Sequence, residues 1–235
     1  MEELNKKSDN VAAMFNSIAA KYDFLNHFLS LGIDKLWRRR LVKQLAKSNP
    51  RQVLDIATGT GDLAIQLAKH HKSVSITGVD ISENMLSIGR EKILKRKLEG
   101  RINLKQANSM SLPFADSEFD AAMVAFGVRN FEDLSKGITE IHRVLKAGGN
   151  LYVLEFSMPS RFPMRNLYRF YFRKVLPFVG GIVSGSKSAY TYLPESVFAF
   201  PEKEKFVEIM ANAGFKNCSY KRLTFGVASI YIGSK

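Results

Sequence analysis

The chain has 235 residues, of which 46% are hydrophobic and 24% charged, a composition typical of a globular protein with one sizeable core. No apolar run reaches the roughly 18 residues that a membrane-spanning helix needs, so we expect no transmembrane segment. Lysine and arginine number 35 against 22 acidic residues, a net charge of +13. This excess suits nucleic acid or an acidic membrane surface as partner, or a merely solvated basic surface, and it does not separate the three.

Cysteine and histidine usage limits the chemistry further. The one cysteine, Cys218, excludes an internal disulfide and indicates a reducing compartment. The first residues lack the apolar stretch of a signal peptide and are too acidic for a transit peptide, so we expect a cytoplasmic protein. The four histidines are scattered without metal-ligand spacing, and we expect no metal site.

Residues 1–48 predict helices, because 11–22 and 37–47 carry apolar residues at roughly helical spacing. From residue 52 to 156, strand-like and helix-like segments alternate, which predicts an α/β fold with a parallel sheet. The predicted strands are 52–56, 74–80, 101–106, 119–125 and 149–156. The predicted helices between them are 62–70, 83–98 and 132–146, the last ended by Gly148 and Gly149.

Residues 157–200 break this alternation and are rich in aromatic residues, arginine and small residues. A helix over 202–213 follows, ended by Gly214, and then two predicted strands at 216–223 and 226–233. These two strands can pair as a hairpin whose last strand is inserted antiparallel. We therefore expect one domain over 1–235, with a helical cap at 1–48 and an insertion at 157–200.

A glycine loop after the first predicted strand is the most informative motif. Asp55 ends that strand, and Gly59 and Gly61 follow it in a turn where a ligand must approach the backbone closely. The pattern alone is weak, since it also opens dinucleotide-binding units or an ordinary strand–helix turn. Asp55 argues against a pyrophosphate there, because its carboxylate suits a cationic amino group. Asp80 ends the second strand, 19 residues after Gly61, where an acid meets ribose hydroxyls.

An amino-acid cation at one end and a ribose at the other describe S-adenosylmethionine. In an open parallel sheet, ligands bind beyond the carboxyl ends of the strands, so the residues after each predicted strand are candidate site positions. These positions include Thr60, Asp80, Asn108, Ser109, Arg129, Asn130 and Glu155.

Three segments carry a resemblance to a known family. They are 22–26 continuing to Ser30 and Trp37, 126–130, and 143–149 continuing to 155–157. With the glycine loop, they resemble class I S-adenosylmethionine methyltransferases, and more narrowly the quinone C-methyltransferases of the UbiE/COQ5 type, which make menaquinone and ubiquinone from demethylated precursors. Leu25, Asp34 and Ala147 depart from that pattern, where methionine, histidine and proline are usual.

The resemblance implies a Rossmann-like fold and S-adenosylmethionine as cofactor. It places Thr60 and Asp80 on that cofactor, with Asn108 and Ser109 near its adenine. Asp80 would hold the ribose hydroxyls, and Asn108 can donate and accept hydrogen bonds at an adenine edge. Without the resemblance, Asn108 is equally well read as an ordinary turn residue.

Candidate catalytic residues lie in the first two of these segments. Tyr22 is a candidate for the substrate pocket, with a core position as the alternative. Arg129 keeps its proton, so it cannot act as a general base; it can stabilise a phenolate or polarise a water, or simply hold its loop through an ion pair. Asn130 can help to orient that water.

The stretch from Arg161 to Lys174 is the most unusual part of the insertion. Pro163 and Pro177 predict the two ends of a helix, along which Arg165, Arg169 and Arg173 recur every fourth residue beside aromatic side chains. A basic, aromatic-rich amphipathic helix is typical of a membrane interface, and the alternative is a helix packed at the domain edge with solvated arginines. We expect peripheral contact with an anionic membrane at its inner face.

The expected reaction, implied by the resemblance, is C-methylation of an isoprenoid-tailed demethylmenaquinol in the last step of menaquinone biosynthesis. A benzoquinol of the ubiquinone pathway or another small acceptor is the alternative. The charge suggests an RNA methyltransferase as a rival, but no base-stacking platform is visible, and Arg38, Arg39 and Arg40 are read as a solvated helix face. A non-enzymatic S-adenosylmethionine sensor is a more distant rival.

Overall fold

A computed structural model describes residues 6–175 and 187–235, and it contains a seven-stranded sheet in the order β3-β2-β1-β4-β5-β7-β6. Neighbouring strands from β3 to β5 run parallel, and β7 is inserted antiparallel between β5 and β6. This confirms the expected mostly parallel sheet with an antiparallel last strand. The strands are β1 Gln52–Ile56, β2 Ser75–Asp80, β3 Ile102–Gln106, β4 Phe119–Ala125, β5 Leu145–Phe156, β6 Lys216–Leu223 and β7 Ala228–Ser234.

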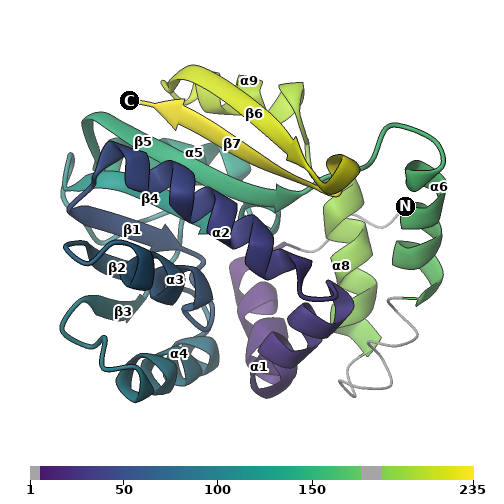
Figure 1. Cartoon of the computed structure of the whole chain (residues 1–235), viewed down its shortest axis with the longest axis horizontal. Coiled ribbons are helices and arrows are strands. Elements are labelled where there is room, and N and C mark those ends of the chain that lie inside the picture. Colours follow the sequence, from purple (N-terminus) through teal and green to yellow (C-terminus); the bar gives the residue numbers. More distant parts are fainter. Residues whose placement is uncertain (1–5, 176–186) are drawn as a thin grey trace.

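Helices cover both faces of the sheet (Figure 1). One face packs against α2, α3 and α4, and the other against α5 and α9. The central strands are therefore buried on both sides, and residues 121–124 of β4 are fully buried. The α-helices of the described residues are α1 Ser8–Leu29, α2 Ile33–Leu45, α3 Asp62–His70, α4 Glu83–Lys95, α5 Leu134–Val144, α6 Met164–Phe170, α8 Lys187–Ala199 and α9 Glu204–Asn212.

The end of α5 differs from the sequence expectation. The helix ends at Val144, and Gly148 and Gly149 belong to β5 instead of capping the helix. Leu145 is already extended and pairs with Phe119, so strand pairing takes over from the helix before the glycines are reached. The register then shifts within β5, and Gly148 has a φ of +77° at this irregularity.

Helices α1 and α8 lie beyond the carboxyl ends of the parallel strands, where Figure 1 shows them side by side. Asn16 fastens α1 to the start of α4, because its Oδ1 accepts the Ser82 hydroxyl at 2.6 Å and its carbonyl accepts the Asn84 amide at 3.2 Å. Apolar residues of α1 also join a separate cluster with Tyr168, Phe172 and Val197 from the insertion. Helix α1 of the expected cap and the insertion thus cover the strand ends, whereas α2 packs on one face of the sheet.

The helix expected between Pro163 and Pro177 consists of two pieces. The α-helix α6 begins after Pro163, and a π-helical turn over Tyr171–Val175 continues it. Pro177 lies outside the described residues. Among the residues that are described, no helix is both long and apolar enough to cross a membrane.

Candidate active site

The loop after β1 is tied to the end of β2. Gly59 and Gly61 have φ values of +56° and +76°, a region that side-chain-bearing residues rarely adopt. The Gly59 N–H donates to Asp80 Oδ2 at 2.8 Å, and the Ser82 N–H donates to Asp80 Oδ1 at 2.9 Å. Burial raises the pKa of Asp80, and these backbone donors limit the rise by stabilising the charged form.

A cleft of about 710 Å³, the long cleft, runs along these loops under α1. Its lining includes Gly59, Asp80, Asn108, Ser109, Tyr22 and Asn130. Asn108 is held in place by the Met110 N–H, which donates to its Oδ1 at 3.0 Å, while its own amide donates to Ser8 Oγ at 3.1 Å. The structure therefore brings together candidates from the loops after β1, β2, β3 and β4 around one elongated space.

Asp55 lies beneath the glycine loop and is almost fully buried. It faces a separate hollow of about 350 Å³, the polar cavity, which it shares with Arg38, Thr60 and Asp62. Burial raises the pKa of Asp55 to about 7, although the Thr58 hydroxyl donates to its Oδ2 at 2.6 Å. A buried carboxylate of this kind is stabilised by a cationic group, such as an ammonium, entering the cavity.

Thr60 is held by side chains from two helices. Its hydroxyl donates to Asp23 Oδ1 of α1 at 2.6 Å and accepts from Lys92 Nζ of α4 at 2.9 Å. Lys92 also pairs with Asp23 at 2.7 Å and with Asp62. The predicted cofactor residue Thr60 thus lines the polar cavity as part of an ion-pair network that fastens α1 over the loop.

A third hollow of about 600 Å³, the apolar cavity, adjoins the long cleft. Much of its wall is apolar, formed by Met14, Phe15, Ile18, Phe126, Phe156 and Leu193. Phe15, Tyr22 and Phe126 line both this cavity and the long cleft, and Tyr22 also borders the polar cavity. Tyr22, which belongs to α1, therefore lies where all three spaces meet.

Arg129 forms a buried ion pair. Its Nη1 lies 2.8 Å from Glu155 Oε1 at the end of β5 and also donates to the Phe126 carbonyl. The structure thus contains the loop-fixing ion pair that the sequence analysis kept as an alternative. Nε of Arg129 has no hydrogen-bond partner among the described residues, although the side chain is only 5% exposed and lines the apolar cavity. Asn130 lines the long cleft instead, and its Oδ1 accepts the Tyr192 hydroxyl at 3.2 Å.

The expectation of a solvated face at residues 38–40 is wrong for Arg38. Arg39 and Arg40 are exposed, but Arg38 is only 8% exposed, pairs with Asp34 and lies over the Phe126 ring at 5.4 Å from its centroid. It lines both the apolar and the polar cavity. The burial of Arg38 could have been predicted from helical spacing, because Asp34, Trp37, Arg38 and Leu41 fall on one face of α2.

The sheet order, the antiparallel β7 and a cleft across the ends of β1 and β2 define a class I methyltransferase fold. A methyltransferase from Thermotoga maritima, described as a possible histamine N-methyltransferase, is similar with a TM-score of 0.66 and 21% identity over 95% of this chain and 99% of that one. A Haemonchus contortus phosphoethanolamine N-methyltransferase in complex with S-adenosylmethionine is similar with a TM-score of 0.61 and 17% identity, over 83% of this chain and 52% of that one. At 21% and 17% identity, these two structures show that the fold is shared and nothing more.

The chain belongs to the ubiE/COQ5 methyltransferase family, whose sequence profile matches residues 2–235. A demethylmenaquinone methyltransferase from Bacteroides fragilis is 46% identical over 98% of this chain and 94% of its own length. A ubiquinone/menaquinone biosynthesis C-methyltransferase from Geotalea daltonii is 47% identical over 100% of both chains. The resemblance drawn from the sequence motifs is thereby confirmed, and the protein is an S-adenosylmethionine-dependent C-methyltransferase.

Proposed function

We propose that this enzyme methylates a ring carbon of demethylmenaquinol to give menaquinol, the last step of menaquinone biosynthesis. The observation that carries the proposal is the apolar cavity, which adjoins the long cleft at Tyr22 and Phe126. A flat aromatic ring fits among the aromatic side chains there, next to a methyl donor in the cleft. The names of the full-length relatives support the same substrate class.

The residues around the long cleft suit the parts of S-adenosylmethionine. In this proposal, Asp80 accepts hydrogen bonds from the ribose hydroxyls, and Asn108 and Ser109 contact the adenine. Asp55 faces the amino group, Gly59 allows close approach to the backbone, and Thr60 holds the loop against α1. Gly61 lines none of the three cavities and serves the turn of the loop through its positive φ. When bound there, S-adenosylmethionine supplies a sulfonium methyl group for transfer to a carbon nucleophile.

Arg129, Asn130 and Tyr22 act on the quinol in this proposal. Removing a proton from a hydroxyl of the quinol raises the electron density of the neighbouring ring carbon, which is the nucleophile. Arg129, which lines the apolar cavity, stabilises the resulting phenolate through the positive charge of its guanidinium, while Glu155 keeps the guanidinium in place. Asn130 orients the ring or a water, and Tyr22 aligns the ring with the donor from its position between the cavities.

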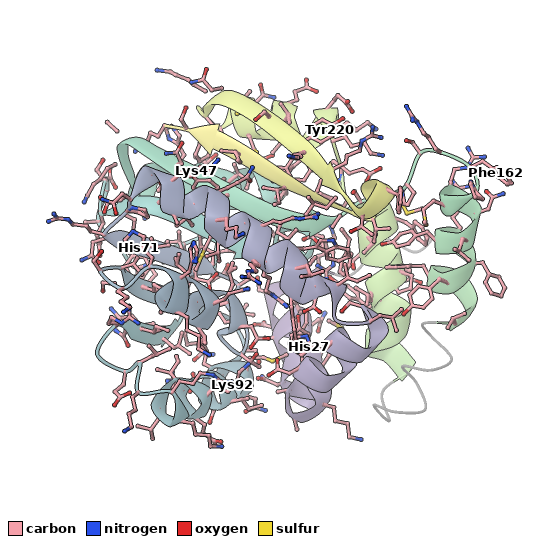
Figure 2. The ribbon with its side chains drawn as sticks, in the orientation of Figure 1. His27, Lys47, His71, Lys92, Phe162 and Tyr220 are labelled. Atoms are coloured by element: carbon pink, nitrogen blue, oxygen red, sulfur yellow. The ribbon has the colours of Figure 1, made fainter. Side chains whose placement is uncertain are left out.

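The same proposal assigns α6 to the membrane interface, because an isoprenoid-tailed quinol resides in the bilayer. Phe162, Leu167 and Phe170 are 77%, 62% and 60% exposed, and Figure 2 places Phe162 at the outer edge of the molecule. The exposed side chains of Arg161, Arg165 and Arg169 lie among them. The side chain of Arg173, the fourth arginine of the expected stripe, lies outside the described residues.

Aromatic contacts connect α6 with the apolar cavity. Tyr168 of α6 stacks on Phe172 with ring centroids 4.3 Å apart, and Phe172 contacts the cavity-lining Phe156 at 6.1 Å. An apolar tail can follow this surface while the ring enters the cavity. The enzyme would then be a cytoplasmic protein that binds reversibly to the inner face of the membrane, with anionic lipid and not nucleic acid as its charged partner.

Two measurements test the substrate. Purified enzyme with S-adenosylmethionine and a short-tailed demethylnaphthoquinol should yield a product heavier by one methylene unit, with the new methyl on the ring. A strain that lacks the protein should accumulate demethylmenaquinone in its extracted lipids. Accumulation of ubiquinone intermediates instead would favour the benzoquinol alternative, and methylation of RNA but of neither quinol would favour the rival suggested by charge.

A further inference from the structure

C-methylation of a quinol requires a route for a proton. The reaction under Proposed function, on which this inference rests, replaces one ring hydrogen by a methyl group and consumes the positive charge of the donor. One proton per turnover must therefore leave the site. The apolar cavity, lined largely by aromatic and aliphatic side chains, is a poor place for a free proton, because burial without a partner disfavours charge.

Asp34 is the carboxylate among the described residues that line this cavity. The other charged side chains in that lining are Arg38 and Arg129, and a guanidinium group cannot accept a proton. Asp34 lies in the first turn of α2 and is only 2% exposed. Burial raises its pKa, but Arg38, the Ser30 hydroxyl and His27 together hold the pKa below its usual value. The group is thus ionised at neutral pH and holds a proton only weakly.

The contacts of Asp34 form a chain from the cavity wall to the surface. Ser30, which also lines the cavity, donates its hydroxyl to Asp34 Oδ1 at 2.6 Å. His27 Nδ1 lies 2.8 Å from Asp34 Oδ2, and the His27 side chain is 27% exposed. Figure 2 labels His27 near the junction of α1 and α2.

Charged groups of α2, α3 and α4 act on these hydrogen-bonded residues. Arg38 of α2 pairs with Asp34 Oδ2, and Asp62 of α3 lies 3.5 Å from His27 Nε2. Lys92 of α4 pairs with Asp62. His27 therefore lies between two carboxylates, Asp34 at Nδ1 and Asp62 at Nε2.

We propose that Ser30, Asp34 and His27 carry the proton of the quinol from the apolar cavity to solvent. As the hydroxyl O–H bond of the quinol breaks, its proton passes to Asp34, either directly or through Ser30, which accepts one proton while donating its own. With the ring proton of His27 on Nε2, Nδ1 accepts the proton from Asp34 and Nε2 releases its own proton to water. Proton exchange with solvent then returns the ring proton to Nε2 before the next turnover. After methylation, the remaining ring hydrogen moves as a proton to the quinol oxygen and its electron pair restores the aromatic ring, so the net release is one proton.

If Asp34 only formed a structural ion pair with Arg38, it would need neither Ser30 nor His27. A proton relay needs His27, so substitution of His27 distinguishes the two roles. In His27→Gln, the side chain can still donate a hydrogen bond to Asp34, but it cannot carry a proton. Turnover of a short-tailed demethylnaphthoquinol should fall about tenfold or more, since positioned proton transfer typically contributes at least that much. Added imidazole should restore part of the loss, and the solvent deuterium isotope effect on turnover should increase.

His71→Gln is the matched control, because His71 bonds to Asn49 and Ser73 on the surface and lines none of the three cavities. The affinity of His27→Gln for S-adenosylhomocysteine, measured by calorimetry, and its unfolding temperature should match those of the control. Turnover equal to the control, without response to imidazole, overturns the relay, as does a parallel loss of affinity and turnover. If wild-type enzyme fails to methylate the quinol at all, the proposed function itself is wrong.

Discussion

Asp80 has the contacts expected of a residue that receives a ligand. Two backbone N–H groups already donate to its carboxylate, one to each oxygen, and a carboxylate has about four acceptor sites. Lone pairs therefore remain for the ribose hydroxyls that the proposed function assigns to Asp80 in the long cleft. The neighbouring Gly59 is tied to the same carboxylate, so in this proposal both the loop geometry and ligand binding depend on one side chain.

We expect Asp80→Ala to weaken S-adenosylhomocysteine binding by about 1–3 kcal/mol, because charge-assisted hydrogen bonds to the ribose are lost. Calorimetric titration measures the change. Asp116→Ala is the control, since the Asp116 side chain is 76% exposed and pairs with Arg143 away from the cleft. Equal affinity of the two folded variants would contradict the assignment of Asp80.

Arg129 has a structural role, and its proposed catalytic role must be separated from it. Arg129→Ala leaves Glu155 buried without its partner, which should lower the free energy of unfolding by about 3–5 kcal/mol. The double variant Arg129→Ala/Glu155→Gln should regain most of that stability, because the unpaired charge is gone. Turnover should remain about 10²-fold low in both variants, as for other positioned charge-stabilising groups.

Chemical denaturation and steady-state kinetics on the single and double variants decide between the two roles of Arg129. A double variant that regains turnover together with stability would show that Arg129 only holds its loop. A fall in cofactor affinity in step with turnover would assign Arg129 to the cofactor instead of the quinol.

Asp55 should couple cofactor binding to pH. Burial raises its pKa to about 7, so the folded protein without ligand binds a proton there that the unfolded chain, with an ordinary carboxyl pKa, releases near pH 4. The contribution of Asp55 to the free energy of unfolding is therefore fully present at low pH, and it is lost as the pH rises towards and through about 7. An incoming ammonium favours the charged carboxylate, so binding below pH 7 should release a proton.

Calorimetry of S-adenosylhomocysteine binding in buffers of different ionisation enthalpy measures that release. It should be close to zero at pH 8.5 and rise as the pH falls to 6. Asp55→Asn should abolish the pH dependence and should stabilise the ligand-free protein at high pH. If wild type and Asp55→Asn release protons equally, the ammonium does not meet Asp55.

At the scale of the elements, α1 forms one wall of the site. One end of the helix contacts the loops after β3 and β4, because Ser8 donates to Glu132 and accepts from Asn108. Its middle is fastened to α4 by Asn16, and its later turns to Thr60 and Lys92 by Asp23. These contacts explain why Tyr22, on the same helix, can border all three cavities.

The element α6 should decide membrane binding. Changing Arg161, Arg165 and Arg169 together to Gln should reduce sedimentation with anionic vesicles, since each exposed basic residue near such a surface contributes about 1 kcal/mol. Methylation of a long-tailed quinol should slow more than that of a short-tailed analogue. Added salt should reproduce part of the effect on sedimentation.

Arg39, Arg40 and Lys43 are an appropriate control set, because they are exposed on α2 and the same number of charges is removed. If both triple variants sediment equally, net charge alone attracts the protein to vesicles and α6 has no special role. Equal slowing of long-tailed and short-tailed substrates would instead indicate that Arg161, Arg165 and Arg169 support the fold.

At the scale of the whole molecule, the site exists only in the folded state. The long cleft combines residues of α1 with the loops after four different strands. A ligand that binds this cleft therefore has no site on the unfolded chain and stabilises the native state by mass action. S-adenosylhomocysteine at 100 times its dissociation constant should raise the free energy of unfolding by about 2.7 kcal/mol.

Thermal unfolding measures this stabilisation, which corresponds to a rise of several degrees for a domain of this size. NADH at the same concentration should leave the unfolding temperature unchanged, because the acid at the end of β1 is unsuited to a pyrophosphate. Stabilisation by NADH, and none by S-adenosylhomocysteine, would be incompatible with the methyltransferase assignment.

Local patterns in the sequence determined most of the elements. The predicted strands 52–56, 119–125 and 216–223 and the helix 62–70 agree with the structure to the residue. Apolar periodicity and turn residues act over a few positions, so a single segment contains the information that places it. The motifs also located the loops that line the long cleft, because parallel strands carry their ligands at one common edge.

Only the tertiary structure decided how the side chains in these loops are paired. Arg129 meets Glu155 and Thr60 meets Asp23 across 26 and 37 positions of the chain, and no local pattern specifies such partners. Arg38 is buried because α2 packs against the strand ends, although its two arginine neighbours are exposed. The sequence by itself thus determined the fold class, the family and the position of the glycine loop. Packing of α1 and α2 over the sheet decided which charges are buried, since burial depends on neighbours that are distant in the chain.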